Sequence, residues 1–255
     1  MLETRDLTIR FGGHVAVDRV SCRFEAGTLT AIVGPNGAGK TTYFNLISGQ
    51  LPASQGQVWL DGQDLSALSA PLRTRKGLGR AFQLTQLFPN LSVQENVRLA
   101  VQAREQGRGH AGLDLLRIWS DRRAWVAEAH VLLQQVRLAD RADAPAASLP
   151  HGDQRKLEVA LLMALDPKVY LFDEPTAGMS VDEVPVVLDL IRQLKARKDC
   201  CILLVEHKMD VVRELSDRIV VLHNGAKVAD GLPAEVIASP VVQQAYLGMA
   251  AEEPA

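Results

Sequence analysis

Apolar and polar residues alternate along three short stretches in the first quarter of the chain. A period of two places all apolar side chains of a stretch on one face, which is typical of a β-strand with one buried face. We therefore expect strands at these positions. The apolar residues are Leu7, Ile9 and Phe11, then Val20, Cys22 and Phe24, and then Val58 and Leu60.

Four continuous apolar runs indicate strands of a second kind, buried on both faces as in a parallel sheet. The last run is followed by Asn224–Gly225, a pair that predicts a hairpin turn. The runs occupy residues 29–34, 169–172, 201–206 and 218–223.

Helical periodicity alternates with these runs and predicts an α/β fold. A helix is expected directly after the first run, in TTYFNLISG, and others at 153–165, 181–197 and 208–215. In the helix at 181–197, the apolar face is expected to consist of Val184, Val187, Leu188, Ile191 and Leu194.

Residues 84–165 lack strand patterning. Residues 123–136 place Trp125, Ala129, Leu132, Leu133 and Val136 on one helical face, and residues 102–114 are expected to form an exposed loop because they are rich in charge and glycine. We therefore expect an α/β core made of residues 1–83 and 166–255, with an inserted helical subdomain at residues 84–165.

Composition narrows the class of protein. With 255 residues and 47% apolar residues, the chain can bury a real core, and its net charge of −2 gives no sign of a nucleic-acid partner. Its three cysteines lack metal-binding spacing, which favours buried or inert thiols. The charged N-terminus does not resemble a signal peptide, and the apolar runs are far shorter than the roughly 20 residues of a membrane span. We expect a soluble chain that reaches a membrane only through a partner.

A phosphate-binding loop follows the first buried run. The segment fits the pattern G-x-x-x-x-G-K-[ST], in which glycines let backbone N–H groups converge on phosphate oxygens and the following helix adds its positive dipole end. Lys40 is expected to neutralise the β- and γ-phosphates, the Thr41 hydroxyl to ligate Mg²⁺, and Thr42 to hold a phosphate oxygen. The predicted ATP-binding residues here are Gly34, Pro35, Asn36, Gly37, Ala38, Gly39, Lys40, Thr41 and Thr42.

Two further buried runs end in groups suited to phosphoryl transfer. Asp173 and Glu174 follow one run, so Asp173 is expected to hold the Mg²⁺ shell and Glu174 to polarise the attacking water, with strand alternation separating the two roles. His207 follows another run, on the sheet edge where ligands bind, and is expected to sense the γ-phosphate. Gln83, between core and insert, is a candidate switch that reports the nucleotide state.

These motifs, in this order, resemble the ATP-binding cassette (ABC) ATPases along essentially the whole chain. The resemblance comprises the P-loop at 34–41, a Q-loop glutamine at Gln83, a signature-like segment at 149–154, Asp173–Glu174, a D-loop at 177–182 and a switch histidine at His207. It implies a P-loop NTPase core with an N-terminal antiparallel β subdomain and an inserted helical subdomain. It also implies that two cassettes sandwich ATP, that Phe11 stacks on adenine, and that Gln83 joins Thr41 and Asp173 around Mg²⁺.

The signature segment departs from the family pattern Leu-Ser-Gly-Gly-Gln. Proline has neither a hydroxyl nor an N–H, so one hydrogen bond to the γ-phosphate bound by the partner cassette is expected to be missing. Gly152 and the helix start remain, so a dipole still faces that phosphate. A weaker site on the partner favours a heterodimeric motor. The residues are Leu149, Pro150, His151, Gly152, Asp153 and Gln154.

Within the family, the runs GDQRKLEVALLMALDPKVYLFDEPTAGM and ILLVEHKMDVV are similar to the larger ATPase subunit of branched-chain amino acid importers. The resemblance implies a second ABC ATPase subunit, two transmembrane permeases and a periplasmic binding protein as partners, at the cytoplasmic face of a bacterial inner membrane. Urea-type importers, lipopolysaccharide export and soluble ABC ATPases remain alternatives. The arginines of the insert form either a solvated face or a contact with head groups or a partner; they are Arg104, Arg108, Arg117, Arg122 and Arg123.

Overall fold

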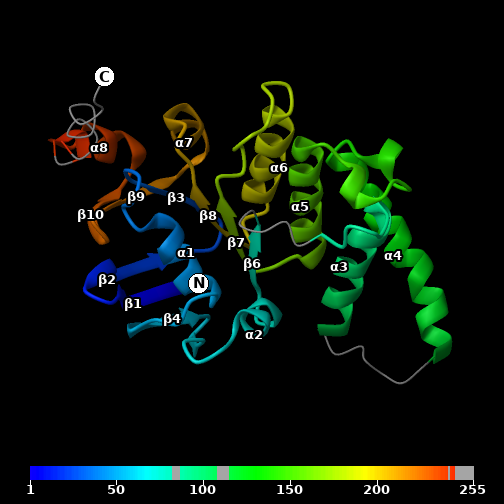
Figure 1. Ribbon diagram of the computed structural model, residues 1–255, viewed down its shortest axis with the longest axis horizontal. Coiled ribbons are helices and arrows are strands. Elements are labelled where there is room, and N and C mark those ends of the chain that lie inside the picture. Colours follow the sequence, from blue (N-terminus) through cyan, green and yellow to red (C-terminus); the bar gives the residue numbers. More distant parts are fainter. Residues whose placement is uncertain (82–86, 108–114, 241, 245–255) are drawn as a thin grey trace. The chain divides into compact units, whose positions relative to one another are not determined.

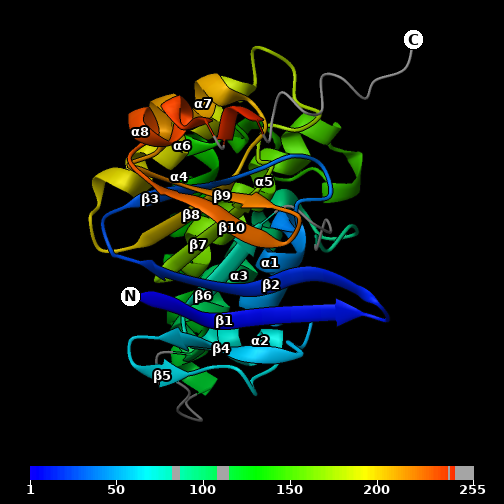
Figure 2. The same cartoon turned by 90° about the vertical axis from the view of Figure 1, so that its left-hand side faces the viewer.

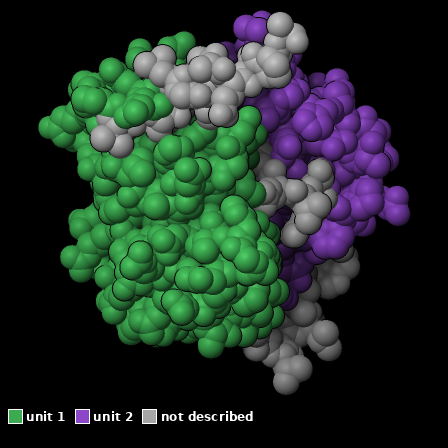
Figure 3. Space-filling view, turned by 60° about the vertical axis from the view of Figure 1, so that its left-hand side comes forward, with its two compact units in different colours: residues 1–78, 168–174, 195–255 green, residues 79–167, 175–194 purple. Residues whose placement is uncertain are grey.

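The computed structural model describes residues 1–81, 87–107, 115–240 and 242–244 (Figure 1). The chain forms two compact units, which Figure 3 shows in different colours. The α/β unit contains residues 1–78, 168–174 and 195–255, and the helical unit contains residues 79–167 and 175–194. Residues 175–194 thus belong to the helical unit, whereas the sequence pattern assigned them to the α/β core.

An antiparallel sheet in the order β2-β1-β4-β5 contains the N-terminal strands, which lie side by side in Figure 2. Its core face carries Leu7 and Val20, which are paired across β1 and β2 and are both fully buried. Phe11, at the end of β1, is half exposed. The strands are β1 (Leu2–Phe11), β2 (His14–Phe24), β4 (Gln55–Leu60) and β5 (Gln63–Asp64).

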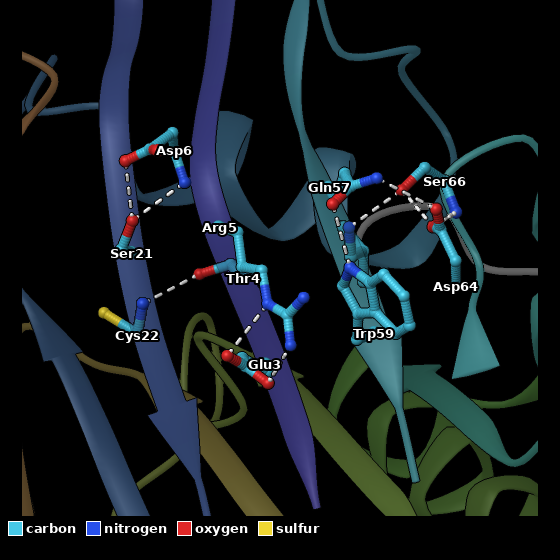
Figure 4. A network of polar contacts seen from close by, with 11 residues as sticks. Glu3, Thr4, Arg5, Asp6, Ser21, Cys22, Gln57, Trp59, Asp64 and Ser66 are labelled. Carbon is cyan, nitrogen blue, oxygen red and sulfur yellow. Dashed lines mark hydrogen bonds and ion pairs between the residues drawn. The ribbon is translucent and has the colours of Figure 1, made fainter. Parts of the chain in front are cut away.

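The other face of this sheet carries a ladder of polar side chains (Figure 4). Arg5 donates two hydrogen bonds of 3.0 Å to Glu3, and its guanidinium lies 4.4 Å from the centre of the Trp59 ring. Ser21 on β2 bonds to both the backbone and the carboxylate of Asp6. Charged and amphipathic groups therefore cover this face, and Glu3 and Arg5 reach it because the register of β1 shifts between Thr4 and Leu7.

A mainly parallel sheet forms the centre of the α/β unit, in the order β10-β9-β3-β8-β7. Every residue of β3, β7 and β8 is buried, as the continuous apolar runs predict. The hairpin prediction is also confirmed, because β9 and β10 pair antiparallel and Asn224 and Gly225 between them have φ of 48° and 77°. The strands are β3 (Leu29–Val33), β7 (Val169–Asp173), β8 (Cys201–Val205), β9 (Arg218–His223) and β10 (Ala226–Gly231).

Helix α1 packs in one apolar core with both sheets, through Tyr43, Phe44, Leu46 and Ile47. A second apolar cluster joins α7 and α8 to residues of β3 and β9. The helices of this unit are α1 (Lys40–Ser48), α2 (Ala70–Arg75), α7 (Met209–Leu215) and α8 (Pro233–Ala238); β6 (Leu78–Ala81) leads into the helical unit.

The helical unit is built around α3, which packs against both α4 and α5. The exposed loop expected at 102–114 is wrong at its start, because α3 continues to Gly107. Arg104 holds this last turn by donating hydrogen bonds of 2.7 and 2.9 Å to the carboxylate of Glu128 on α4. The elements are α3 (Val93–Gly107), α4 (Leu115–Gln135), α5 (His151–Leu165) and α6 (Val184–Ala196, to Leu194 in this unit), with 3-10 turns at Ala139–Arg141 and Ala146–Ser148.

Two expectations from composition have a structural outcome. In the part of the chain that the structure describes, no helix is long and apolar enough to cross a membrane. All three cysteines are buried and free, as the interpretation of buried thiols predicts.

Candidate functional site

The P-loop connects β3 to α1 through positions that tolerate only glycine. Gly34 has φ of 152°, and a Cβ there would lie 2.1 Å from the carbonyl oxygen of Leu222. Gly39 has φ of 97°, and its Cβ would lie 2.4 Å from the carbonyl oxygen of Ala16. The loop is therefore wedged against its neighbours in a conformation that no L side chain could share.

Lys40 is the first residue of α1 and is only 6% exposed. Its ammonium donates hydrogen bonds to the carbonyl oxygens of Gly34 (2.7 Å) and Pro35 (2.9 Å), so it lies across its own loop. Burial lowers the pKa of Lys40, while the charges of Glu174 and Asp173 act to raise it. The ammonium and the two carboxylates thus share one electrostatic site.

The start of α1 offers positive potential. Gly39 caps the helix without a side-chain hydrogen bond, and the first turn contains no acidic residue. Its free backbone N–H groups and dipole therefore suit an anion. Thr41 and Thr42 lie in this turn with partly exposed side chains.

Asp173 and Glu174 have different environments. Asp173 ends β7 and is 4% exposed, whereas the Glu174 side chain is 40% exposed. Strand alternation does not separate them, because Glu174 lies beyond the strand in a left-handed conformation with φ of 53°. Its backbone N–H donates to the Val205 carbonyl at 2.9 Å, which ties it to the neighbouring strand.

His207 lies two residues beyond Val205, and its Nε2 is 2.8 Å from Oε1 of Glu174. A carboxylate in its ionised form only accepts hydrogen bonds, so an ion pair or hydrogen bond with that form requires a proton on Nε2 of His207. Sequence reasoning missed Glu206, which is 4% exposed and accepts hydrogen bonds from the backbone N–H groups of His207 (2.9 Å) and Lys208 (3.2 Å). The signal was a carboxylate directly before the histidine and before α7.

Phe11 is 50% exposed at the end of β1, so its ring is open to a ligand. Gln83 lies outside the described residues.

The signature segment leads into α5 in the helical unit. Pro150 occupies the N-cap position with φ of −55° and ψ of 157°, and no side chain caps the helix. The Gln154 amide donates to the Leu149 carbonyl at 2.9 Å. Asp153 is buried and pairs with Lys156 at 2.6 Å and Arg141 at 3.3 Å, so it points into the unit.

Comparison with known proteins identifies the family. Residues 17–177 match the family described as ABC transporter. The chain belongs to this family. The branched-chain amino acid transport ATP-binding protein BraF of Pseudomonas aeruginosa is 38% identical over 252 residues, and LivG of Escherichia coli is 36% identical over 253, each alignment covering 98% of both chains.

Solved structures agree with this assignment. MJ1267, an ATP-binding cassette of an ABC transporter, matches 96% of this chain and 98% of its own at 27% identity, with a TM-score of 0.80. The dimeric cassette MJ0796, at 22% identity and a TM-score of 0.78, shares the fold. The chain is an ATP-binding and ATP-hydrolysing subunit of an ABC transporter.

Proposed function

We propose that this ABC ATPase powers the import of branched-chain amino acids. The observation that carries the proposal is the likeness to BraF and LivG over nearly the whole of each chain. The proposed assembly has a second, paralogous ATPase subunit, two transmembrane permeases and a periplasmic binding protein. The chain would act at the cytoplasmic face of a bacterial inner membrane and would bind no nucleic acid.

Hydrolysis is assigned to the group at the carboxyl edge of β7 and β8. Glu174 takes a proton from the attacking water, because its side chain is 40% exposed and can reach solvent. His207, 2.8 Å away, orients that carboxylate and senses the γ-phosphate. Lys40 exchanges its loop carbonyls for the β- and γ-phosphates, which stabilises charge on the transferring phosphoryl group.

The donors of the site fit Mg²⁺. Thr41 supplies a hydroxyl and Asp173 a nearly buried carboxylate, and Mg²⁺ prefers such hard oxygen ligands together with waters and substrate phosphates. Gln83 is assigned to the same shell by family likeness. When bound, the ion supplies charge that neutralises the phosphate oxygens. Among the described residues no group of three or more His, Cys, Asp or Glu side chains could hold a metal, which fits an ion brought in with the nucleotide.

The remaining site residues are assigned to the adenine and to the phosphates of the nucleotide. Phe11 stacks on adenine, for which its half-exposed ring is available. Glycine backbone at Gly34, Gly37 and Gly39, with Pro35, Asn36 and Ala38 between them, cradles the phosphates, and Thr42 holds a phosphate oxygen.

The signature segment, from Leu149 to Gln154, is assigned to the ATP of the partner cassette. The absence of a cap at Pro150 leaves the α5 dipole as its main source of attraction for phosphate. A partner site served by this segment is weaker than the site in this chain, and this asymmetry supports a heterodimer.

Replacement of the base tests the catalytic assignment. Glu174→Gln should keep nucleotide binding but lower turnover by about 10²- to 10⁴-fold, the usual contribution of a general base. Glu25→Gln, which changes an exposed carboxylate directly after β2, is the matched control and should retain turnover. Normal hydrolysis by the Glu174→Gln complex would remove Glu174 from this role.

The cargo needs a separate test. The reconstituted complex, supplied with its binding protein, should hydrolyse ATP faster with leucine, isoleucine or valine than with urea. Stimulation by urea alone would contradict branched-chain amino acid import and leave the ATPase assignment intact.

A further inference from the structure

Glu183, just before α6, bonds to the chain on its N-terminal side. Its Oε2 accepts hydrogen bonds from the backbone N–H of Ser180 (3.0 Å) and from the Ser180 hydroxyl (2.9 Å). This is the Ser-x-x-Glu arrangement of a capping box. The hydrogen bond from the backbone N–H contributes most to holding the pKa of Glu183 below its usual value, so the carboxylate is charged at neutral pH.

The same carboxylate lies against the start of α5. A Cβ built on Gly152 would be 2.2 Å from both carboxylate oxygens of Glu183. A side chain at this position would require the carboxylate, which is the far end of a flexible side chain, to shift from the place in which its Oε2 contacts Ser180. The space beside Gly152 is therefore occupied by the Glu183 carboxylate of the same chain.

Lys156 adds a second connection between the two segments. Its ammonium is 2.6 Å from Asp153 on α5 and 3.6 Å from Oε1 of Glu183. The side chains of Lys156 and Asp153 are 10% and 11% exposed, so this group is weakly screened by solvent.

The imidazole ring of His151 makes a further contact between the two segments. A Cβ on Gly178 would lie 3.0 Å from Cε1 of His151, which shows that the imidazole rests on the backbone there. Gly178 and Ser180 belong to the D-loop segment, and His151 and Gly152 to the signature segment. The two segments are therefore joined by two contacts: the side chain of Glu183 reaches Gly152, and the side chain of His151 reaches Gly178.

We propose that Glu183 is a positioning residue for the signature segment, which it locks to residues 178–180 by occupying the space that Gly152 leaves open. The proposal rests on the proposed function in that the signature segment acts on ATP in the partner cassette. Gly152 is then required because it leaves room for the Glu183 carboxylate of the same chain, in addition to any contact with the phosphate bound by the partner cassette.

A double-mutant cycle tests this lock. Gly152→Ala and Glu183→Ala remove the same contacts, so each should lower turnover of the assembled complex by about tenfold, and the double variant should be within about threefold of either. The isolated chain should show the same non-additivity in its thermal unfolding midpoint. ATP affinity of the isolated chain should not change, because its own P-loop contains none of these residues.

Two further variants separate positioning from general destabilisation. Glu183→Gln keeps an acceptor for Ser180 but loses the charge beside Lys156, so its turnover should lie between wild type and Glu183→Ala. Glu235→Ala removes a first-turn glutamate from α8 and should leave turnover unchanged.

Three results would overturn the proposal. The first is a double variant whose loss of turnover is the product of the losses caused by Gly152→Ala and Glu183→Ala, and the second is wild-type turnover by Glu183→Ala. The third is non-additivity in the unfolding midpoint while the turnover of every variant stays at the wild-type level. Failure of the import function would be recognised differently, as a wild-type complex that ignores branched-chain amino acids while still hydrolysing ATP.

Discussion

Replacing Pro150 with serine would restore the hydroxyl that the signature segment lacks. The backbone can accept this change, because φ of −55° and ψ of 157° are ordinary extended values for serine at an N-cap. The hydrogen bond from the Gln154 N–H to the carbonyl oxygen of residue 150, 2.9 Å long, uses only the backbone and is retained. Pro150→Ala is the matched control, since it removes the ring without adding a hydroxyl.

The expected effect on the isolated chain is small. A serine N-cap adds about 1 kcal/mol of stability over alanine. Loss of proline removes about 0.4–1 kcal/mol by freeing the unfolded chain. Pro150→Ser should therefore be close to wild type in free energy of unfolding, and Pro150→Ala should melt about 2–4 °C below Pro150→Ser.

The effect in the assembled complex should be larger. A hydrogen bond to a charged group contributes about 1.5–3 kcal/mol, or roughly 10- to 150-fold in affinity at 1.4 kcal/mol per tenfold. The partner's site should bind ATP more tightly with Pro150→Ser and turn it over faster, while Pro150→Ala should stay at the wild-type level or below. The assay is steady-state ATPase kinetics of the complex with each variant. Unchanged kinetics for Pro150→Ser, or equal gains for serine and alanine, would refute the inferred asymmetry.

Three further predictions concern the α/β unit. All three cysteines are buried, and burial raises the pKa of Cys22 and raises that of Cys201 to about 12, so none should react with maleimide at pH 8 until the chain is unfolded; rapid native labelling would contradict the buried-thiol packing. Tyr43→Phe removes the buried 2.7 Å hydrogen bond to Thr4 and should cost about 1 kcal/mol in urea unfolding, because Thr4 still accepts from a backbone N–H; no loss would mean that the bond is not formed. Gly39→Ala should lose about 2 kcal/mol or more and bind ATP poorly, because its Cβ would lie 2.4 Å from the Ala16 carbonyl; wild-type titration calorimetry and stability would contradict this wedge.

Local chemistry explains what the sequence predicts correctly. Buried strands such as β3 and β8 are continuous apolar runs, and Asn224–Gly225 supplies two residues that accept positive φ. The P-loop is recognisable because its glycines stand at positions where the backbone has positive φ. Each of these signals is complete within about ten residues.

Distant partners explain what the sequence does not show. The charged and glycine-rich end of α3 looks like a loop until Glu128, 24 residues away, pairs with Arg104. Residues 175–194 follow a strand of the α/β unit, yet Glu183 finds its contacts at Lys156 and Gly152. In β1, register shifts after Thr4 and after Leu7 break simple alternation, so Thr4 and Thr8 are buried alongside the apolar residues.

The meeting of Glu174 and His207 depends on strand register more than on the identity of either residue. Asp173 pairs with Val205 in the parallel ladder of β7 and β8, and the Glu174 N–H extends that ladder by one bond to the Val205 carbonyl. Because Glu174 then turns into the left-handed region and Glu206 caps the two N–H groups that follow it, the two side chains converge at 2.8 Å. A slip of one residue between the strands would displace His207 by about 3.3 Å, beyond hydrogen-bond reach. The sheet therefore sets the distance between Glu174 and His207, and Glu206 sets the direction in which the histidine points.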